Sequence, residues 1–190
     1  MHFLPRQWGR KKKKYKDGNQ MNEKKTWKIY IYAAFFLAIA VLLQSLRLLV
    51  PMIPGPVNMF LIGSLVNMTL VMAVVYTGKL PLAALGLLLP FIAFLQGALP
   101  VAFMIPVVGA GNLLYAVLVF WLWNKPWVFI AAVFKAAALT GGMLLVSLLV
   151  QLPEKMGTAL AFMMGWPQIV TGVLGILLAK YILRRLPPCR

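Results

Sequence analysis

The residues of this chain that could do chemistry are few, and four of them fall deep within long apolar stretches. Asn67, Asn112, Lys135 and Gln168 each lie about nine to eleven residues from the expected end of an apolar helix. A helix rises about 1.5 Å per residue, so all four positions fall near the middle of a lipid bilayer. Their similar depths predict one shared polar cavity.

Lys135 is the first candidate for ligand binding. A lysine ammonium at the bilayer centre costs roughly 3 kcal/mol on the lenient insertion scale, so Lys135 should face protein, water or an anionic ligand. Two alternatives stay open from the residues alone. The Lys135 ammonium could bind neighbouring carbonyls or extend toward the cytoplasm, and each amide could serve helix packing.

Further candidates lie on the same helix faces or near the outer surface. Tyr115 follows Asn112 by three residues and shares its helix face. Arg47, Gln96 and Glu154 fall near the outer ends of helices, where they could form the mouth of the cavity or a lid over it. For Glu154, ordinary loop charge is the alternative. Trp166 stands two residues before Gln168 and completes the candidate substrate-binding set.

Reactive groups are too scarce for an enzyme. The chain has one histidine, His2, and three acids, Asp17, Glu23 and Glu154. No apolar segment combines serine with histidine, paired aspartates or a zinc-binding histidine pair, as an intramembrane protease would need. We therefore expect no enzymatic activity, no metal site and no cofactor.

The composition predicts an all-α, polytopic membrane protein. Hydrophobic residues make up 62% of the chain and charged residues 12%, which is too apolar for a soluble domain. Pro, Gly and polar clusters divide the chain into six expected helices. These helices cover approximately 27–50, 57–77, 82–95, 100–123, 127–149 and 158–183.

The distribution of basic residues predicts that both termini are cytoplasmic. Lys79, Lys125 and Lys180 fall on the same side as the basic N-terminal segment, and the positive-inside rule places that side in the cytoplasm. The expected organisation is a basic tail over 1–26, a six-helix domain over 27–186 and a short tail over 187–190. The basic tail could suggest nucleic-acid binding, but contact with anionic lipid is favoured because the tail adjoins a membrane helix.

Several short stretches form a recognisable combination. They are Gln44-Ser45-Leu46-Arg47, Gly63-Ser64-Leu65-Val66-Asn67, Gly111-Asn112-Leu113-Leu114-Tyr115, Pro153-Glu154-Lys155-Met156, and Trp166-Pro167-Gln168 followed by Thr171-Gly172. Through these stretches the chain resembles the substrate-binding S components of energy-coupling-factor (ECF) transporters, in particular those of unassigned specificity. The resemblance covers roughly residues 29–186.

This resemblance implies a subunit of a bacterial or archaeal cell-membrane importer. It would capture a vitamin-like or other small micronutrient from outside. Ala34 and Ala38, four residues apart, match the family pattern that contacts the transmembrane T component, and two ATP-binding subunits would supply the energy. The chain itself has no Gly-x-x-x-x-Gly-Lys-Ser/Thr phosphate loop. The alternative function is a non-transport assembly or sensory subunit.

Overall fold

The computed structural model describes residues 6–49, 55–78 and 82–186, and side chains from residue 26 onward within these ranges except near the two gaps. The described residues form helices and no strands. The helices are α1 (Arg6–Leu49), α2 (Gly55–Thr77), α3 (Leu82–Leu95), α4 (Met104–Leu122), the short 3-10 helix η1 (Pro126–Phe129), α5 (Ile130–Val150), α6 (Glu154–Met164) and α7 (Trp166–Arg185). The all-α prediction is confirmed.

Five stretches of the described chain are long and apolar enough to cross a membrane. They are Thr26–Leu48, Val57–Thr77, Met104–Leu122, Pro126–Val150 and Glu154–Arg185. The remaining apolar helix, α3, has 14 residues, and its length of about 21 Å is less than the roughly 30 Å of hydrocarbon. The chain is thus a multi-pass membrane protein with five candidate spans and one shorter apolar helix.

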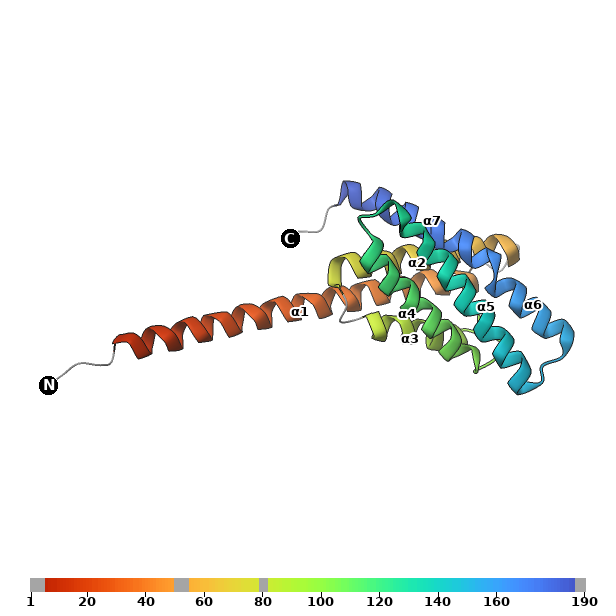
Figure 1. The fold of residues 1–190 in the computed structure, drawn as a ribbon, viewed down its shortest axis with the longest axis horizontal. Coiled ribbons are helices and arrows are strands. Elements are labelled where there is room, and N and C mark those ends of the chain that lie inside the picture. Colours follow the sequence, from red (N-terminus) through yellow and green to blue (C-terminus); the bar gives the residue numbers. More distant parts are fainter. Residues whose placement is uncertain (1–5, 50–54, 79–81, 187–190) are drawn as a thin grey trace.

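Helix α1 begins much earlier than the sequence pattern indicated. The apolar span starts at Thr26, close to the expected Trp27, but the helix continues back to Arg6 through the basic segment. Lysine, arginine, glutamine and methionine are good helix formers, and no proline lies between Pro5 and Pro51. In Figure 1 this part of α1 projects from the bundle.

The expected helix over 158–183 is two helices in the structure. α6 ends at Met164, Gly165 has a non-helical backbone (φ −87°, ψ −122°), and α7 begins at Trp166. Pro167 has no N–H to donate to the carbonyl of Met163, so a continuous helix would lose a hydrogen bond there. A proline is tolerated in the first turn of a new helix, which is where Pro167 lies.

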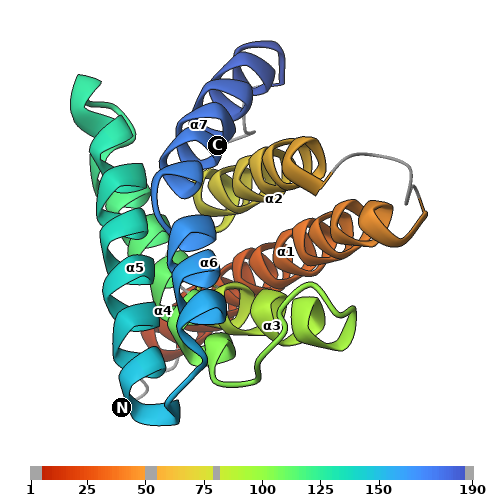
Figure 2. The ribbon, with the colours of Figure 1, turned by 90° about the vertical axis from the view of Figure 1, so that its right-hand side faces the viewer.

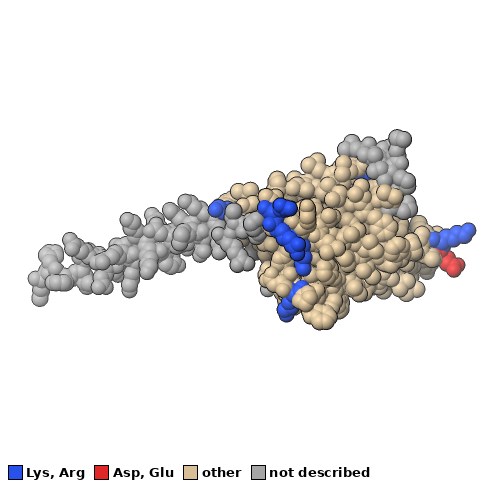
Figure 3. All heavy atoms as spheres, turned by 90° about the horizontal axis from the view of Figure 1, so that it is seen from above, with Lys and Arg blue, Asp and Glu red and all other residues tan. Residues whose placement is uncertain are grey.

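The two ends of the bundle differ in charge and in aromatic content. At one end the Tyr76 hydroxyl donates to the carbonyl of Leu186 (2.9 Å), and the rings of Tyr32 and Tyr76 lie 5.7 Å apart, so α1, α2 and α7 meet. Lys180 lies over the rings of Trp123 and Phe129 at this end. Figure 3 shows basic side chains here, and an acidic side chain beside a basic group at the far end. We call the first the basic end.

The helices pack in two groups. α2 packs chiefly against α7 and α1, whereas α4 packs against α3 and α5, and the two groups meet where α5 packs against α7. α6 packs against both α5 and α7. Figure 2, seen from the end opposite the basic end, shows α5 and α6 running side by side. Large apolar side chains such as Leu148 and Leu149 are exposed on the outside, as expected for surfaces that face lipid.

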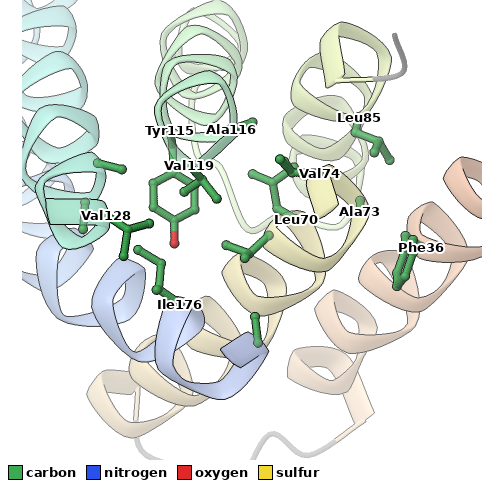
Figure 4. Close-up of a cluster of buried hydrophobic side chains, with 14 residues drawn as sticks. Phe36, Leu70, Ala73, Val74, Leu85, Tyr115, Ala116, Val119, Val128 and Ile176 are labelled. Atoms are coloured by element: carbon green, nitrogen blue, oxygen red, sulfur yellow. The ribbon is translucent and has the colours of Figure 1, made fainter. Parts of the chain in front are cut away.

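Two apolar clusters fill the interior. The cluster near the basic end joins α1 to α5, η1 and α7 around Tyr115, which points from α4 toward Ile176 of α7 (Figure 4). The second cluster, in the opposite half, joins α3 to α6 around Leu139 and Met143. The polar side chains of the candidate site lie between these two clusters.

Glycines allow close approach of α7 to its neighbours. A Cβ atom at Gly175 would lie 2.6 Å from the Cβ of Asn67, and one at Gly172 would lie 2.8 Å from the Cβ of Ala132. Small residues at such crossings let helix backbones approach within membranes, where packing supplies much of the association energy. These contacts bring α2, α5 and α7 close enough for their polar side chains to meet.

Replacing Gly175 by alanine should therefore destabilise the bundle. The added methyl group meets the Asn67 backbone at 2.9 Å, and overpacking of this kind costs about 1–3 kcal/mol. The matched control is Gly141→Ala on α5, where no atom lies within 4 Å of the new Cβ and helix propensity gains roughly 0.5–1 kcal/mol. Thermal unfolding in detergent should separate the two variants, and equal stability would contradict the close-packing argument.

Candidate ligand-binding site

A cavity of about 150 Å³ lies between the two apolar clusters, in the half of the bundle away from the basic end. It is lined from α1 to α7 by every long helix, including α6 through Met163 and Met164. Five of the residues chosen from the sequence line it: Arg47, Asn67, Asn112, Lys135 and Gln168. Five helices thus bring these side chains to one place, as the shared depth of four of them predicted.

Lys135 is the most buried charged side chain of the site. It is 3% exposed, and its Nζ donates a 2.6 Å hydrogen bond to Oδ1 of Asn67. The Asn67 Nδ2 donates in turn to Oγ1 of Thr171 at 3.2 Å. Both ends of the Asn67 amide are therefore used within the protein, which fixes the orientation of the amide and the place of the ammonium.

Tyr115 packs against the Lys135 ammonium from behind the cavity lining. The Lys135 Nζ lies 5.0 Å from the centre of the Tyr115 ring, within the range of a cation–π interaction. The Tyr115 hydroxyl donates to the carbonyl of Gly172 at 2.7 Å, so the ring is held in place from α7. A tyrosine that is fully buried needs this polar partner, because an unpaired hydroxyl in an apolar core is costly.

Asn112 and Gln44 carry polar atoms without a partner among the described residues. The Asn112 side chain is 7% exposed, lines the cavity and makes no hydrogen bond in the described structure. Gln44 donates weakly to the carbonyl of Leu89 (3.5 Å), while its Oε1 is buried and unpaired. Buried amides usually find partners, so these groups are available to a ligand or to water.

Gln168 has a structural role as well as a place in the cavity wall. Its Nε2 lies 3.4 Å from the carbonyl of Met163, the group that Pro167 leaves without a donor. The next carbonyl, that of Met164, accepts from Oγ1 of Thr140 at 3.3 Å. Backbone groups freed by a break in a membrane helix must be satisfied by neighbouring protein or water. The break at Gly165 is satisfied in this way.

The other sequence candidates lie outside the cavity lining. Gln96, in the connection after α3, donates to Oγ of Ser45 at 2.9 Å. Glu154 is exposed at the start of α6, and Trp166 is exposed beside the rings of Phe60 and Phe162. Tyr115 is under Lys135, as described above, and does not line the cavity itself. The structure therefore places Gln96, Glu154 and Trp166 outside the cavity lining, whereas Tyr115 contacts the site through Lys135.

Two contributors were missing from the sequence-based set. Thr171 holds the Asn67 amide, and Gln44 lines the cavity beside Arg47. Helical spacing carries a signal for both, because Thr171 follows Gln168 by three residues and Gln44 precedes Arg47 by three. Their roles depend on contacts between helices distant in sequence, which spacing alone does not reveal.

No protein-family model matches this chain, and no curated protein or solved structure matches it either.

The Lys135–Asn67 hydrogen bond should be visible as a coupling in stability. Asn67→Ala leaves the Lys135 ammonium without its acceptor and should cost about 1–3 kcal/mol. Adding Lys135→Met to Asn67→Ala removes the unpaired charge and should recover most of that loss. Unfolding measurements on both single variants and the double variant give the coupling. Strictly additive effects would show that the ammonium does not depend on Asn67.

Proposed function

We propose that this chain is the substrate-binding subunit of an ECF-type importer, which captures a small micronutrient from outside the cell. The observation that carries the proposal is the convergence of Arg47, Asn67, Asn112, Lys135 and Gln168, from five helices, on one cavity. Structural packing alone does not account for it, because Asn112 has no protein partner in the described structure. A cavity with a few placed polar groups and otherwise apolar walls is typical of small-molecule sites.

The position of the cavity supports uptake from the outside. It lies away from the basic end, and the partial exposure of Arg47 and Met163 leaves its outer edge open. The positive-inside rule would place the basic end, with Lys125, Lys180 and Arg184, in the cytoplasm. In this proposed topology the chain crosses six times, α3 being one short crossing, and both termini are cytoplasmic in a bacterial or archaeal cell membrane.

The energy for uptake would come from partner proteins. The chain contains no phosphate-binding loop, so ATP hydrolysis would belong to two ATP-binding subunits, coupled through a T component. Ala34 and Ala38 are both exposed on the same face of α1. Their small side chains let a partner helix approach closely, which fits the proposed interface with the T component.

A second candidate function is a non-transport assembly or sensory subunit. The feature that favours it is the basic helical segment of α1, which projects beyond the bundle and could recruit a protein or anionic lipid. In that case the polar interior would stabilise packing, and the tail would carry the function.

The proposed assembly can be tested by purification of the tagged chain from native membranes. We expect a T component and two ATP-binding subunits to co-purify. Ala34→Leu combined with Ala38→Leu should abolish this recovery, because the larger side chains separate the helices. Ala137→Leu, at an exposed position of α5, is the matched control and should leave recovery unchanged. Recovery of other partners in place of these three would refute the importer assignment.

Deletion of residues 1–23 separates the two candidate functions. An importer subunit should keep its partners and its ligand binding, because the cavity and the Ala34–Ala38 face remain. If the deletion removes the biological function while ligand binding persists, the tail carries the function and the second candidate is correct.

The proposed topology predicts opposite accessibility of two lysine positions. In a Cys189→Ser background, Lys155→Cys should react with a membrane-impermeant maleimide in intact cells, because it lies at the start of α6 on the outer side. Lys125→Cys, between α4 and η1, should react only after permeabilisation. The reverse pattern would place the cavity on the cytoplasmic side and contradict uptake from outside.

A further inference from the structure

Among the described residues, the charges that face the cavity are all positive: Lys135 and Arg47 line it, and no acidic side chain does. Among the described side chains the only carboxylate is Glu154, which is exposed at the start of α6 and forms no ion pair. The groups that contact the Lys135 ammonium, the Asn67 amide oxygen and the Tyr115 ring, are uncharged. The positive charge at the base of the cavity is therefore not neutralised by any side chain that the structure describes.

The hydrogen-bonding groups at the base divide into occupied and available ones. Asn67 has committed its oxygen to Lys135 and its nitrogen to Thr171, so its amide positions the ammonium. Lys135 has three N–H donors and uses one on Asn67, and the Asn112 amide, which also lines the cavity, uses none. The free donors of Lys135 and Asn112 can bind oxygen atoms of an anion, and hydrogen bonds to a charged group are stronger than neutral ones.

Apart from Gln44, Arg47 and Gln168, the rest of the lining is apolar, and the space is small. Ile62, Val66, Leu99, Val108 and Leu139 form much of the wall around Lys135. The volume of about 150 Å³ is comparable with that of an apolar cavity that takes up a benzene ring, which is roughly 150 Å³. An inorganic anion would leave these apolar walls without an apolar group to contact. A neutral hydrocarbon would leave the Lys135 ammonium without an anionic partner.

We infer that this site takes a small organic anion, such as a carboxylate with an apolar body about the size of one ring. Lys135 and Asn112 hold the anionic group, Asn67 is the positioning residue that keeps the ammonium in place, and the aliphatic wall covers the apolar body. Arg47 lies at the outer edge, where its charge attracts an approaching anion. This inference rests on the proposed function, since it names the class of molecule that the subunit captures.

The test compares two isosteric probes, benzoate and benzamide, by calorimetric binding to the full chain in lipid nanodiscs. The wild-type chain should bind benzoate at least tenfold more tightly than benzamide. Lys135→Met should remove this preference, whereas Lys155→Met, which deletes an exposed lysine that does not line the cavity, should keep it. Equal binding of the two probes to the wild-type chain, or binding of neither at millimolar concentration, would overturn the inference.

Asn67→Asp provides a second variant that nearly preserves side-chain shape. The new carboxylate keeps an acceptor for Lys135 but neutralises the positive charge at the bottom of the cavity. Benzoate affinity should therefore fall at least tenfold, while benzamide binding should change little. Unchanged benzoate affinity in a folded Asn67→Asp protein would overturn the assigned role of the Lys135 charge. Thermal unfolding of each variant verifies folding before binding is measured.

These outcomes are distinguishable from a failure of the proposed function, because assembly is measured without a ligand. If the T component and ATP-binding subunits co-purify but benzoate and benzamide bind equally, the inference of an anionic ligand is refuted and the proposed importer function stands. If the chain prefers benzoate through Lys135 but recruits none of those partners, the inferred anion site stands and the proposed importer function is refuted.

Discussion

The structure depends on one constraint, the placement of a lysine ammonium within an apolar helical bundle. Transfer of this charge into hydrocarbon is unfavourable by roughly 3 kcal/mol or more, so the helices around Lys135 must supply polar atoms or space for them. Asn67 and Tyr115 supply the contacts, and Thr171 and Gly172 hold those two residues in turn. Four helices are thereby tied to one another around a single charge.

Close helix packing and the polar network depend on each other. The Asn67 amide can reach both Lys135 and Thr171 only because Gly175 lets α7 lie against α2, and Gly172 lets α7 lie against α5. Lipid offers no hydrophobic driving force for helix association, so the bundle relies on this combination of tight contacts and buried hydrogen bonds. The same side chains that stabilise the bundle therefore also shape the base of the cavity.

Much of the fold and part of the site could be predicted from the sequence, for physical reasons that differ between residues. Apolar length located the spans, and depth along each helix correctly grouped Asn67, Asn112, Lys135 and Gln168 around one cavity. Depth does not give the rotation of a helix or the path of a loop, so it could not show that Gln96, Glu154 and Trp166 lie outside the cavity lining.

Local breaks and helix extensions were also beyond the sequence pattern. Hydropathy cannot distinguish one long helix from two that meet at Gly165, because the residues on both sides are apolar. The extension of α1 back to Arg6 follows from the helix propensity of this segment. Hydropathy does not predict it, because the segment is polar. Pairing between helices, such as that of Asn67 with Thr171, requires the three-dimensional arrangement itself.

The dense cluster around Tyr115 closes the cavity on the side toward the basic end. Between Lys135 and the basic end, Val74, Val119 and Ile176 fill the interior and leave at most 1% of their surface exposed. A molecule in the cavity cannot pass through this layer unless well-packed helices separate. Such a separation would expose the Lys135 ammonium along with the apolar core. In the proposed importer, release of a ligand on the cytoplasmic side would thus require the whole bundle, or its surroundings, to change orientation while the cavity walls stay intact.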